Sequence, residues 1–409
     1  MQAPDPVYRM KTRRTRQVRA GQLPDLGERP LVEAICQSSA YAFGDAAQAD
    51  DWFASGQPLY SRDRLPNVRT LERVVAELEG AEDAVAVASG MSAIATTLLA
   101  LLRSGEHVII GEDAYCETTS LLLMLADHFN VRVARVDLND PTALDAAIMP
   151  DTRLVLAETI SNPGLRLLDL PAVAALARRR GVLLAVDNTF ATPILCRPLA
   201  FGADLVIHSA GKFLAGHSDV TAGVIAGSGA LIAQLKRSSH LYGPVLAPME
   251  AWLTTRGIKT LLPRVTWMSQ SAGRVALWLA DQPAVEGVNY PGLADHAQAV
   301  LAARLLPQGG GAVISFRIRG GHEAAAAVIH HLRLIPYVPS VGGVTTIVSF
   351  PPQMPPDLIA LDSAPPRCEG GMLRLSLGLE DPADIIEDLG NAFVLAGKDA
   401  PTLASRNGS

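Results

Sequence analysis

Unbroken apolar runs alternate with helical patterns through the middle of the chain. The pattern predicts a helix over 71–78 and a strand over 84–88, with Ser89-Gly90-Met91 opening the next helix. Further apolar runs predict strands at 107–110, 131–136, 153–157, 182–186 and 203–208. Because these runs are continuous rather than alternating, they are typical of strands covered on both faces, and we expect a doubly wound α/β domain.

The regions on either side have other patterns. Residues 1–70 are irregular and rich in turn formers, and a helical connector is expected over 248–282. Beyond a boundary near 285, a smaller α+β domain is expected, with strands at 312–318, 344–350 and 372–377 and helices near 322–333 and 382–396. The predicted organisation is an N-terminal arm and oligomer-contact segment (1–70), an α/β domain (71–285), a C-terminal α+β domain (286–398) and a disordered tail (399–409).

Composition and charge narrow the class of protein. The chain has 409 residues, of which 49% are apolar, enough for a large core and a second domain. A net charge of −6 argues against nucleic acid or an anionic membrane as the main partner. The first twenty residues hold six basic side chains against one acidic one, which we interpret as a solvated arm or an oligomer contact, with nucleic-acid binding or organelle targeting as the alternative.

The four cysteines are scattered and form no CxxC pair: Cys36, Cys116, Cys196 and Cys368. This spacing argues against a zinc site or a disulfide framework and fits a reducing cytoplasm. Residues 1–30 lack the apolar core of a signal peptide, and no apolar run approaches the length of a membrane span. We therefore expect a cytoplasmic protein without a metal.

A lysine and a carboxylate follow two neighbouring predicted strands. Asp187 closes the run 182–186, and Lys212 follows the run 205–208 within Ser209-Ala210-Gly211-Lys212. Pyridoxal 5'-phosphate (PLP) needs a lysine that forms an imine with its aldehyde and a carboxylate that keeps its ring nitrogen protonated. The two residues therefore point to PLP and to amino-acid chemistry.

Other strand ends supply groups that a PLP site uses. The turn Ser89-Gly90-Met91 presents helix N–H groups to a phosphate, and Ser209 can add a hydroxyl. Tyr115 follows another strand and can stack on the ring. Glu158 and Asn162 lie at the carboxyl edge of the predicted sheet, where such folds bind ligands. Each residue alone has an ordinary structural explanation as a turn, cap or packing residue; the ordered combination is more specific.

From about residue 12 to 395 the chain resembles the Cys/Met metabolism family of PLP enzymes, which includes cystathionine γ-synthase, cystathionine γ-lyase and methionine γ-lyase. The blocks that carry the resemblance are Tyr60-Ser61-Arg62, Ser89-Gly90-Met91, Tyr115, Glu158 with Ser161-Asn162-Pro163, 187–193, 209–212 with 216–219, Arg256-Gly257 and 374–380. The resemblance implies a fold-type I (aspartate aminotransferase-like) PLP domain with a smaller C-terminal domain, assembled as a homotetramer of two active dimers.

The resemblance also implies residue roles. Lys212 would be the Schiff-base lysine and proton carrier, Asp187 would pair with the pyridinium nitrogen, and Tyr115 would stack on the ring and help handle the leaving group. The remaining implied roles are phosphate binding by Ser89, Gly90, Met91 and Ser209 and, across the dimer interface, by Tyr60 and Arg62. Arg374, Ser340 and Asn162 would bind the substrate α-carboxylate, and Asn162 would also contact the cofactor.

Several positions depart from the family pattern, among them Leu65-Pro66-Asn67, where the family has Asn-Pro-Thr in the entrance loop. Gly211 stands where the family has serine or threonine, which predicts looser PLP binding through the loss of a hydroxyl. Ser120 and Pro339 replace residues that serve the distal end of cystathionine, which argues against that substrate. Glu117 lies two residues after Tyr115 and either recognises a cationic or hydrogen-bond-donating substrate side chain or faces solvent from a first helical turn. Cys116 is one position from the reactive cysteine of methionine γ-lyases, and that role is not carried over.

The leading hypothesis is a PLP-dependent lyase that catalyses β- or γ-elimination on a sulfur-containing or related L-amino acid. The alternatives are a γ-replacement transferase acting on an O-acylated homoserine and a specialised biosynthetic enzyme whose unusual amino acid is recognised by Glu117. A non-catalytic binding module is disfavoured because Lys212, Asp187, Tyr115 and Arg374 are all present. A nicotinamide dehydrogenase is disfavoured because no G-x-G-x-x-G follows the first strand.

Overall fold

The computed structural model describes residues 12–19, 31–63, 65–350 and 370–403. They form two compact units, each made of two stretches of the chain. The first unit is Met1–Leu101 with Asp204–Leu262, and the second is Leu102–Ala203 with Pro263–Ser409. Arg9 and Lys11, two of the six basic side chains of the predicted arm, and Cys368 lie outside the described residues.

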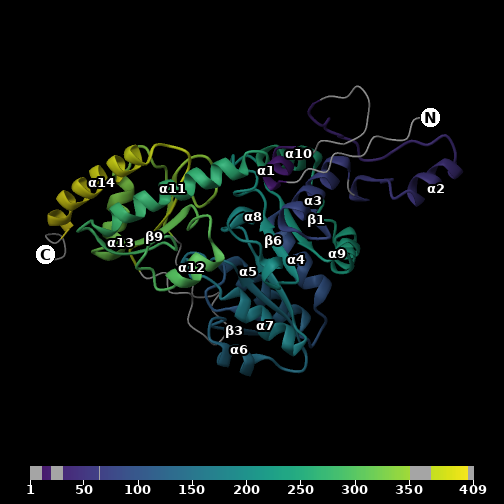
Figure 1. Cartoon of the computed structure of the whole chain (residues 1–409), viewed down its shortest axis with the longest axis horizontal. Coiled ribbons are helices and arrows are strands. Elements are labelled where there is room, and N and C mark those ends of the chain that lie inside the picture. Colours follow the sequence, from purple (N-terminus) through teal and green to yellow (C-terminus); the bar gives the residue numbers. More distant parts are fainter. Residues whose placement is uncertain (1–11, 20–30, 64, 351–369, 404–409) are drawn as a thin grey trace. The chain divides into compact units, whose positions relative to one another are not determined.

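The first unit is an antiparallel three-strand arrangement covered by helices (Figure 1). Its strands follow the order β1-β7-β6, and β7 is antiparallel to both neighbours. The strands are β1 (Asp83–Val87), β6 (Leu205–Ser209) and β7 (Gly223–Gly227). The helices are α1 (Arg13–Val18), α2 (Ala46–Ala54), the 3-10 turn η1 (Ser61–Asp63), α3 (Pro66–Glu79), α4 (Gly90–Leu101), α9 (Gly229–Tyr242) and α10 (Pro248–Ile258).

Helix α3 shows how local sequence and packing combine in this unit. Pro66 occupies the first helical turn, where its missing N–H costs nothing, and Gly80 ends the helix in the left-handed conformation. Leu71 and Val75 are fully buried, and α3 packs against both β1 and α10. Burying each such side chain contributes about 1.5–3 kcal/mol, so α3 is held by packing rather than by helix propensity.

The second unit begins with parallel strands in the order β5-β4-β2-β3. These strands are β2 (His107–Gly111), β3 (Arg132–Val136), β4 (Thr152–Glu158) and β5 (Leu183–Asp187). The helices in this stretch are α5 (Cys116–Phe129), α6 (Pro141–Ala147), α7 (Leu170–Arg180), α8 (Thr192–Leu195) and the 3-10 turn η2 (Pro198–Phe201).

The second stretch of this unit adds a four-stranded antiparallel sheet in the order β10-β11-β9-β8. Its strands are β8 (Val285–Asn289), β9 (Val313–Ile318), β10 (Ile347–Ser349) and β11 (Met372–Ser376). The helices are α11 (Leu261–Ala280), α12 (Ala299–Leu305), α13 (Gly321–His331) and α14 (Pro382–Leu403). α11, α13 and α14 share an apolar core with this sheet (Figure 1). Against this core, Trp278 stacks on Phe393 with 5.8 Å between the ring centroids.

Most predicted elements are confirmed to within a few residues, and two of three differences have a physical reason. β7 was not predicted because glycines bound its short run at both ends. β8 was assigned to a domain boundary because it contains Glu286, Gly287 and Asn289, which resemble a linker. Residues 1–70, predicted to be irregular, contain α1, α2 and the start of α3.

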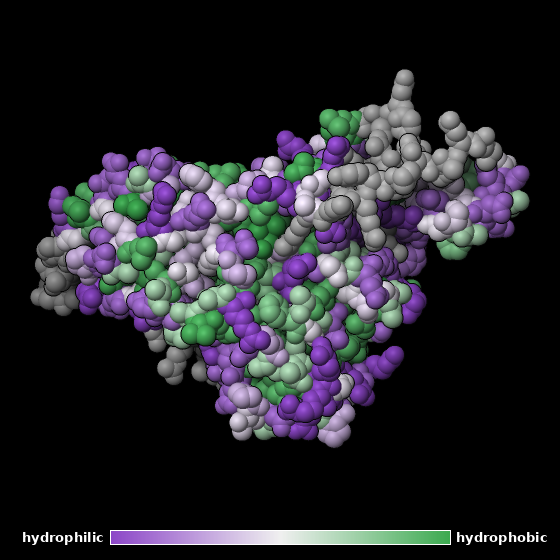
Figure 2. Space-filling model, viewed as in Figure 1, coloured by the Kyte–Doolittle hydropathy of each residue, from purple (hydrophilic) through white to green (hydrophobic). Residues whose placement is uncertain are grey.

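The domain boundaries themselves stay predictions. α14 extends to Leu403, into the segment predicted to be a disordered tail, and residues 404–409 lie outside the described part. Among the described residues, no helix is long and apolar enough to cross a membrane. Hydrophilic residues and smaller hydrophobic areas are interspersed on the face shown in Figure 2.

Candidate active site

In the first unit, the predicted phosphate-binding turn is built where β1 leads into α4. Ser89 caps this helix: its Oγ accepts a hydrogen bond from the Ser92 backbone N–H at 3.0 Å. Gly90 lies so close to Ser209 that a Cβ at position 90 would come within 2.7 Å of the serine hydroxyl. The start of α4 and the Ser209 side chain therefore meet, and helix N–H groups beside a hydroxyl suit a phosphate.

Lys212 lies in the turn that follows β6. Its backbone N–H donates to the Ser209 carbonyl at 3.1 Å, and its carbonyl accepts from Gly216 at 2.7 Å. At Gly211 the backbone packs tightly against residues 220–221, and a Cβ there would overlap the carbonyl oxygen of Val220. Only glycine therefore fits this close approach of the backbone. The absence of a hydroxyl at this position is a separate consequence of the same residue.

In the second unit, Glu158 joins two of the predicted site segments. Its Oε1 accepts from the Tyr115 backbone N–H at 2.7 Å and its Oε2 from the Asn162 N–H at 3.1 Å. Glu158 ends β4 directly opposite Asp187 at the end of β5. Burial and then the negative charge of Asp187 hold the pKa of Glu158 well above its usual value, against the pull of the two N–H donors.

Arg374, on β11, brings the predicted carboxylate-binding residues together. Its Nη1 donates to Asn162 Oδ1 at 2.6 Å, and its Nη2 donates to the Ser340 carbonyl at 3.3 Å. Ser340 thus contacts the arginine through its backbone. The second unit accordingly connects Tyr115, Glu158, Asn162, Arg374 and Ser340 in one continuous set of hydrogen bonds.

Tyr115 precedes α5, and the first turn of that helix contains Cys116 and Glu117. Burial, followed by the charges of Cys116 and Glu117, raises the pKa of the Tyr115 phenol, while Arg374 opposes the shift. Burial, followed by Glu117, also raises the pKa of the Cys116 thiol, which disfavours a reactive thiolate. Glu117 itself is exposed. Its exposed position agrees with both interpretations of this residue.

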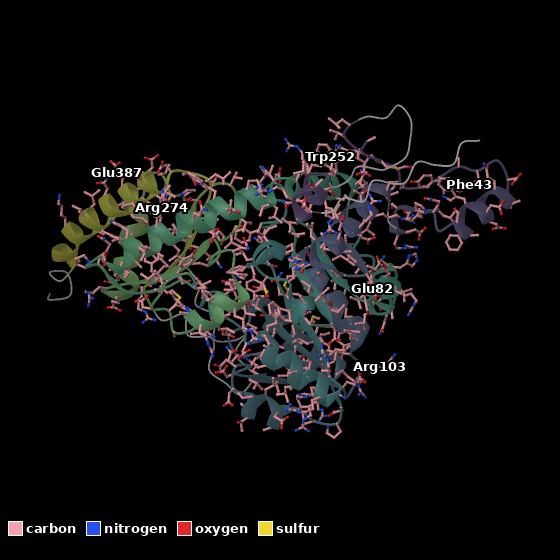
Figure 3. The ribbon with its side chains drawn as sticks, in the orientation of Figure 1. Phe43, Glu82, Arg103, Trp252, Arg274 and Glu387 are labelled. Carbon is pink, nitrogen blue, oxygen red and sulfur yellow. The ribbon has the colours of Figure 1, made fainter. Side chains whose placement is uncertain are left out.

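Tyr60 and Arg62 lie in and beside η1 of the first unit and face outward. Tyr60 is 47% exposed, and the Arg62 guanidinium lies 5.6 Å from the centre of its ring. The arm that carries them is attached to the unit by Trp252 of α10, which donates to the Glu33 carbonyl at 2.9 Å (Figure 3). Both side chains are thus exposed at the surface of this unit.

Two residues with contacts at the site were not predicted. Asn289 donates to the Gly164 carbonyl and Ser315 to the Pro163 carbonyl, so both hold the loop that contains Asn162. Ser315 is 2% exposed within the mainly apolar strand β9, whereas Asn289 is half-buried in β8, which also contains Glu286 and Gly287. A buried polar side chain therefore provided a signal at Ser315 but none at Asn289, and neither partner was deducible from the pattern.

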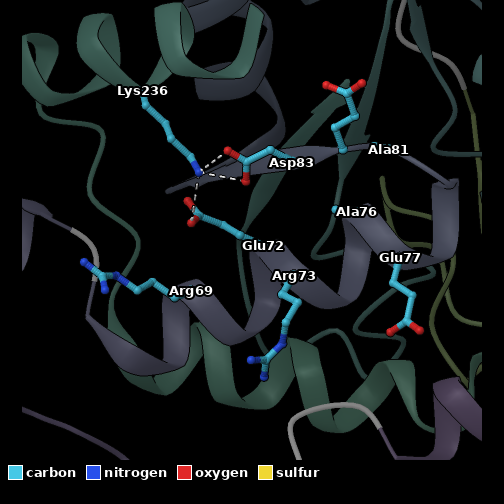
Figure 4. A pocket seen from close by; sticks show the side chains of 9 residues that line it. Arg69, Glu72, Arg73, Ala76, Glu77, Ala81, Asp83 and Lys236 are labelled. Atoms are coloured by element: carbon cyan, nitrogen blue, oxygen red, sulfur yellow. Dashed lines mark hydrogen bonds and ion pairs between the residues drawn. The ribbon is translucent and has the colours of Figure 1, made fainter. Parts of the chain in front are cut away.

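The first unit also contains a cavity of about 590 Å³ that includes none of the predicted site residues (Figure 4). It lies on α3 and β1, where Lys236 contacts Asp83 at 2.7 Å and Glu72 at 3.9 Å. Glu82, also in its lining, caps α9 by accepting from the Gly229 N–H at 2.7 Å. Lys236 is thus engaged with Asp83 and Glu72, and Glu82 with a helix N-terminus, and no predicted site residue lines the cavity.

Comparisons with known proteins establish the family. The family model for Cys/Met metabolism PLP-dependent enzymes matches residues 14–394. O-succinylhomoserine sulfhydrylase of Pseudomonas aeruginosa is 40% identical over 364 residues, covering 87% of this chain and 89% of that protein. L-methionine gamma-lyase of Pseudomonas putida is 38% identical over 384 residues, covering 93% and 96%. A solved structure of cystathionine gamma synthase from Xanthomonas oryzae pv. oryzae, in complex with aminoacrylate and cysteine, has a TM-score of 0.89 at 35% identity, covering 95% of this chain and all of that one.

The chain belongs to the Cys/Met metabolism family of PLP-dependent enzymes. The predicted fold-type I architecture, enzymatic nature and PLP cofactor are thereby confirmed. Each unit by itself contains groups that suit the cofactor: in the first, the start of α4 beside Ser209 suits a phosphate, and in the second, Asp187 supplies a carboxylate at a strand end. The relatives include both lyases and transferases, so the leading hypothesis and its alternative are each consistent with the family.

Proposed function

We propose that this enzyme catalyses β- or γ-elimination on a sulfur-containing or related L-amino acid. The observation that carries the proposal is the Arg374 guanidinium, hydrogen-bonded to Asn162 and Ser340 within the set that includes Tyr115. An arginine fork in this setting suits the α-carboxylate that all α-amino acids share. The methionine gamma-lyase relative, 38% identical over nearly the whole chain, supports elimination as the outcome.

The residues of the chain divide the work. When bound, PLP supplies an aldehyde for imine formation and a ring that accepts the electrons released at the substrate α-carbon. Lys212 holds the cofactor and afterwards carries protons at the α- and γ-carbons. Asp187 keeps the ring nitrogen protonated. Ser89, Gly90, Met91 and Ser209 bind the phosphate through backbone N–H groups and hydroxyls, supported by the contact between Gly90 and Ser209.

Tyr115 is proposed to stack on the cofactor and to donate a proton to the leaving group. A tyrosine phenol carries its proton at neutral pH, and the raised pKa of Tyr115 acts in the same direction, so the hydroxyl is available as a donor. Glu158 holds the Tyr115 backbone at 2.7 Å and so sets the position of the phenol. A leaving thiolate would thereby be protonated as it departs, a step that elimination and replacement share.

The alternative is γ-replacement on an O-acylated homoserine. The sulfhydrylase relative, 40% identical, supports it, and Ser120 in place of an arginine is compatible with an uncharged leaving group. A specialised substrate with a cationic or hydrogen-bond-donating side chain is a third proposal, supported by the exposed Glu117 on α5. All three share the α-carboxylate contact and differ in what happens at the distal end.

A substrate panel separates these proposals. Purified enzyme with PLP is given L-methionine, L-homocysteine, L-cystathionine, L-cysteine, or O-acetyl-L-homoserine with and without a thiol, and 2-oxo acid and thioether products are measured. Elimination predicts 2-oxo acid from methionine or homocysteine alone. Product that requires both acyl-homoserine and a thiol would replace elimination by γ-replacement, and turnover of neither would favour the specialised substrate.

We further propose a cytoplasmic homotetramer of two active dimers, in which Tyr60 and Arg62 complete the phosphate site of the neighbouring subunit. Their exposure, together with exposed Trp52 and Phe53 on α2, supports an interface at this arm. The free thiols of Cys36, Cys116 and Cys196 support the cytoplasmic location.

Mixing subunits tests the shared site. Arg62→Ala and Lys212→Ala homo-oligomers are each expected to have little activity, whereas unfolding and refolding them together should restore part of it in hybrid dimers. Sedimentation of the wild-type enzyme gives the oligomeric state. A failure of hybrids to regain activity, despite mixed oligomers seen by mass spectrometry, would contradict donation across the interface.

A further inference from the structure

Three polar residues form a row across the antiparallel sheet of the second unit. Asn289 on β8 is the register partner of Ser315 on β9, and Ser315 is the register partner of Arg374 on β11. Residues paired in this way point to the same face of a sheet, at a spacing of about 4.8 Å between strands. The row therefore presents three side chains in line on one face.

The row contacts three consecutive residues of the Asn162 loop. Arg374 Nη1 donates to the Asn162 side chain at 2.6 Å, and Ser315 Oγ donates to the Pro163 carbonyl at 2.5 Å. Asn289 Nδ2 donates to the Gly164 carbonyl. Each residue of 162–164 is thus held by a different strand. The strand order β11, β9, β8 matches the residue order 162, 163, 164 along the loop.

His296 determines which way the Asn289 amide points. Its Nε2 lies 2.7 Å from Asn289 Oδ1, while its Nδ1 accepts from the Gln298 backbone N–H at 3.1 Å. Since Nδ1 is an acceptor, Nε2 must carry the proton, and it donates to the oxygen of the amide. The amide nitrogen then faces the Gly164 carbonyl. Burial lowers the pKa of His296, against the charge of Asp295, which agrees with a neutral ring.

Gln298 extends the same support to the other side of the loop. Its side-chain oxygen accepts from the Leu167 N–H at 2.8 Å, and its nitrogen donates to the Leu167 carbonyl at 2.7 Å. Within the loop, Ser161 closes the turn by accepting from the Arg166 N–H at 3.1 Å, and Leu165 has a φ of +54°. A non-glycine residue in this left-handed region is held there by its surroundings.

We propose that Asn289, Ser315 and His296 are positioning residues that fix the Asn162 loop on the sheet, so that Asn162 and Arg374 are aligned for the substrate α-carboxylate. The proposal rests on the proposed α-carboxylate contact. The same sheet holds both Arg374 and the Asn162 loop, so the relative position of Asn162 and Arg374 is set before substrate binds. Removing a member loosens the loop for every amino-acid substrate alike, because the α-carboxylate is common to them all.

The test compares Asn289→Ala and His296→Ala with His296→Gln, whose side-chain N–H can still donate to Asn289. Asn391→Ala and His330→Ala make the same changes at exposed positions of α14 and α13 and serve as matched controls. Amide hydrogen exchange of residues 161–168 is measured in the cofactor-free protein. We expect exchange about tenfold faster in both alanine variants, rates near wild type in His296→Gln, and unchanged rates in the controls.

Binding of an unreactive amino acid gives the second readout. L-norleucine has no leaving group, and its dissociation constant from the PLP-loaded enzyme is obtained from the change in cofactor absorbance. Asn289→Ala and His296→Ala should weaken binding about tenfold, with PLP affinity unchanged. Unchanged hydrogen exchange at 161–168 in both alanine variants would overturn the proposal that Asn289 and His296 fix the Asn162 loop. Faster exchange with unchanged norleucine binding would overturn its role in substrate alignment, whereas no norleucine binding by the wild type would instead refute the proposed α-carboxylate site.

Discussion

Replacing Glu158 by glutamine tests two effects of this buried carboxylate separately: its effect on protein stability and its positioning of Tyr115 and Asn162. The carboxylate accepts two backbone N–H groups, from Tyr115 and Asn162, at 2.7 and 3.1 Å. It also lies opposite Asp187 on the neighbouring parallel strand. Glutamine keeps the shape and one acceptor oxygen, removes the charge and turns an amide toward one of the two N–H groups.

The magnitudes of these effects oppose each other. A hydrogen bond to a charged acceptor contributes about 1.5–3 kcal/mol, so glutamine forfeits roughly that much at one of the two loops. Two neighbouring carboxylates repel by on the order of a few kcal/mol at an effective dielectric constant of about 20, and burial adds a desolvation cost. The raised pKa of Glu158 shows that burial and Asp187 outweigh the two N–H donors. Glu158→Gln should therefore leave the cofactor-free protein at least as stable as wild type at neutral pH.

The pH dependence has a definite sign. A carboxyl whose pKa is higher in the folded than in the unfolded state binds protons more tightly when folded, so wild-type stability falls as the pH rises from the ordinary glutamate pKa toward the raised one. Glutamine does not titrate and removes this slope. The stability of Glu158→Gln relative to wild type should therefore rise with pH through that window.

Urea unfolding of the cofactor-free proteins across pH 4 to 8 measures this difference, and kcat/KM measures the functional cost. Because one loop loses its acceptor, kcat/KM should fall about tenfold or more even where stability is retained. A relative stability of Glu158→Gln that declines with increasing pH would refute the reasoning. Unchanged kcat/KM would show that Glu158 does not position Tyr115 and Asn162.

The remaining predictions concern single residues of the site. Arg374→Ala should raise KM about 100-fold for every substrate, since a charged fork to the α-carboxylate is lost; a change confined to one substrate would contradict this role. Glu117→Gln should lower kcat/KM only for substrates with a cationic or hydrogen-bond-donating distal group, and an equal effect across the panel would indicate a structural role. Gly211→Ser should lower the melting temperature and weaken PLP binding, because its Cβ meets the Val220 carbonyl; tighter PLP binding would instead support the lost hydroxyl as the dominant effect.

The order of strands and helices was predictable where burial dictates the residue type. Continuous apolar runs identified β2, β4 and β5 because strands covered on both faces exclude polar residues. β7 escaped prediction because glycines at both ends allow close packing, as at Gly223, where a Cβ would overlap the Ser89 carbonyl. Such glycines are selected by neighbours distant in sequence, which local patterns do not reveal.

Prediction of the site residues was limited in the same way, to those that a local pattern identifies. Asp187 and Glu158 were identifiable from their places at strand ends, and the pairing of their strands brings them face to face. Asn289 and Ser315 were not, since their partner is a loop more than a hundred residues away. A polar residue in a buried strand indicates that a partner exists, and only the tertiary structure identifies it.

The measurement that tests the central claim most directly locates the lysine that holds PLP. The PLP-loaded enzyme is reduced with sodium borohydride and digested, and the modified peptide is identified by mass spectrometry. The account predicts a phosphopyridoxyl group on Lys212 and none on Lys236, which is engaged with Asp83 at 2.7 Å, or on Lys11, Lys259 and Lys398. Modification of another lysine, or equal modification of a Lys212→Ala variant, would contradict the assignment of Lys212 and with it the proposed mechanism.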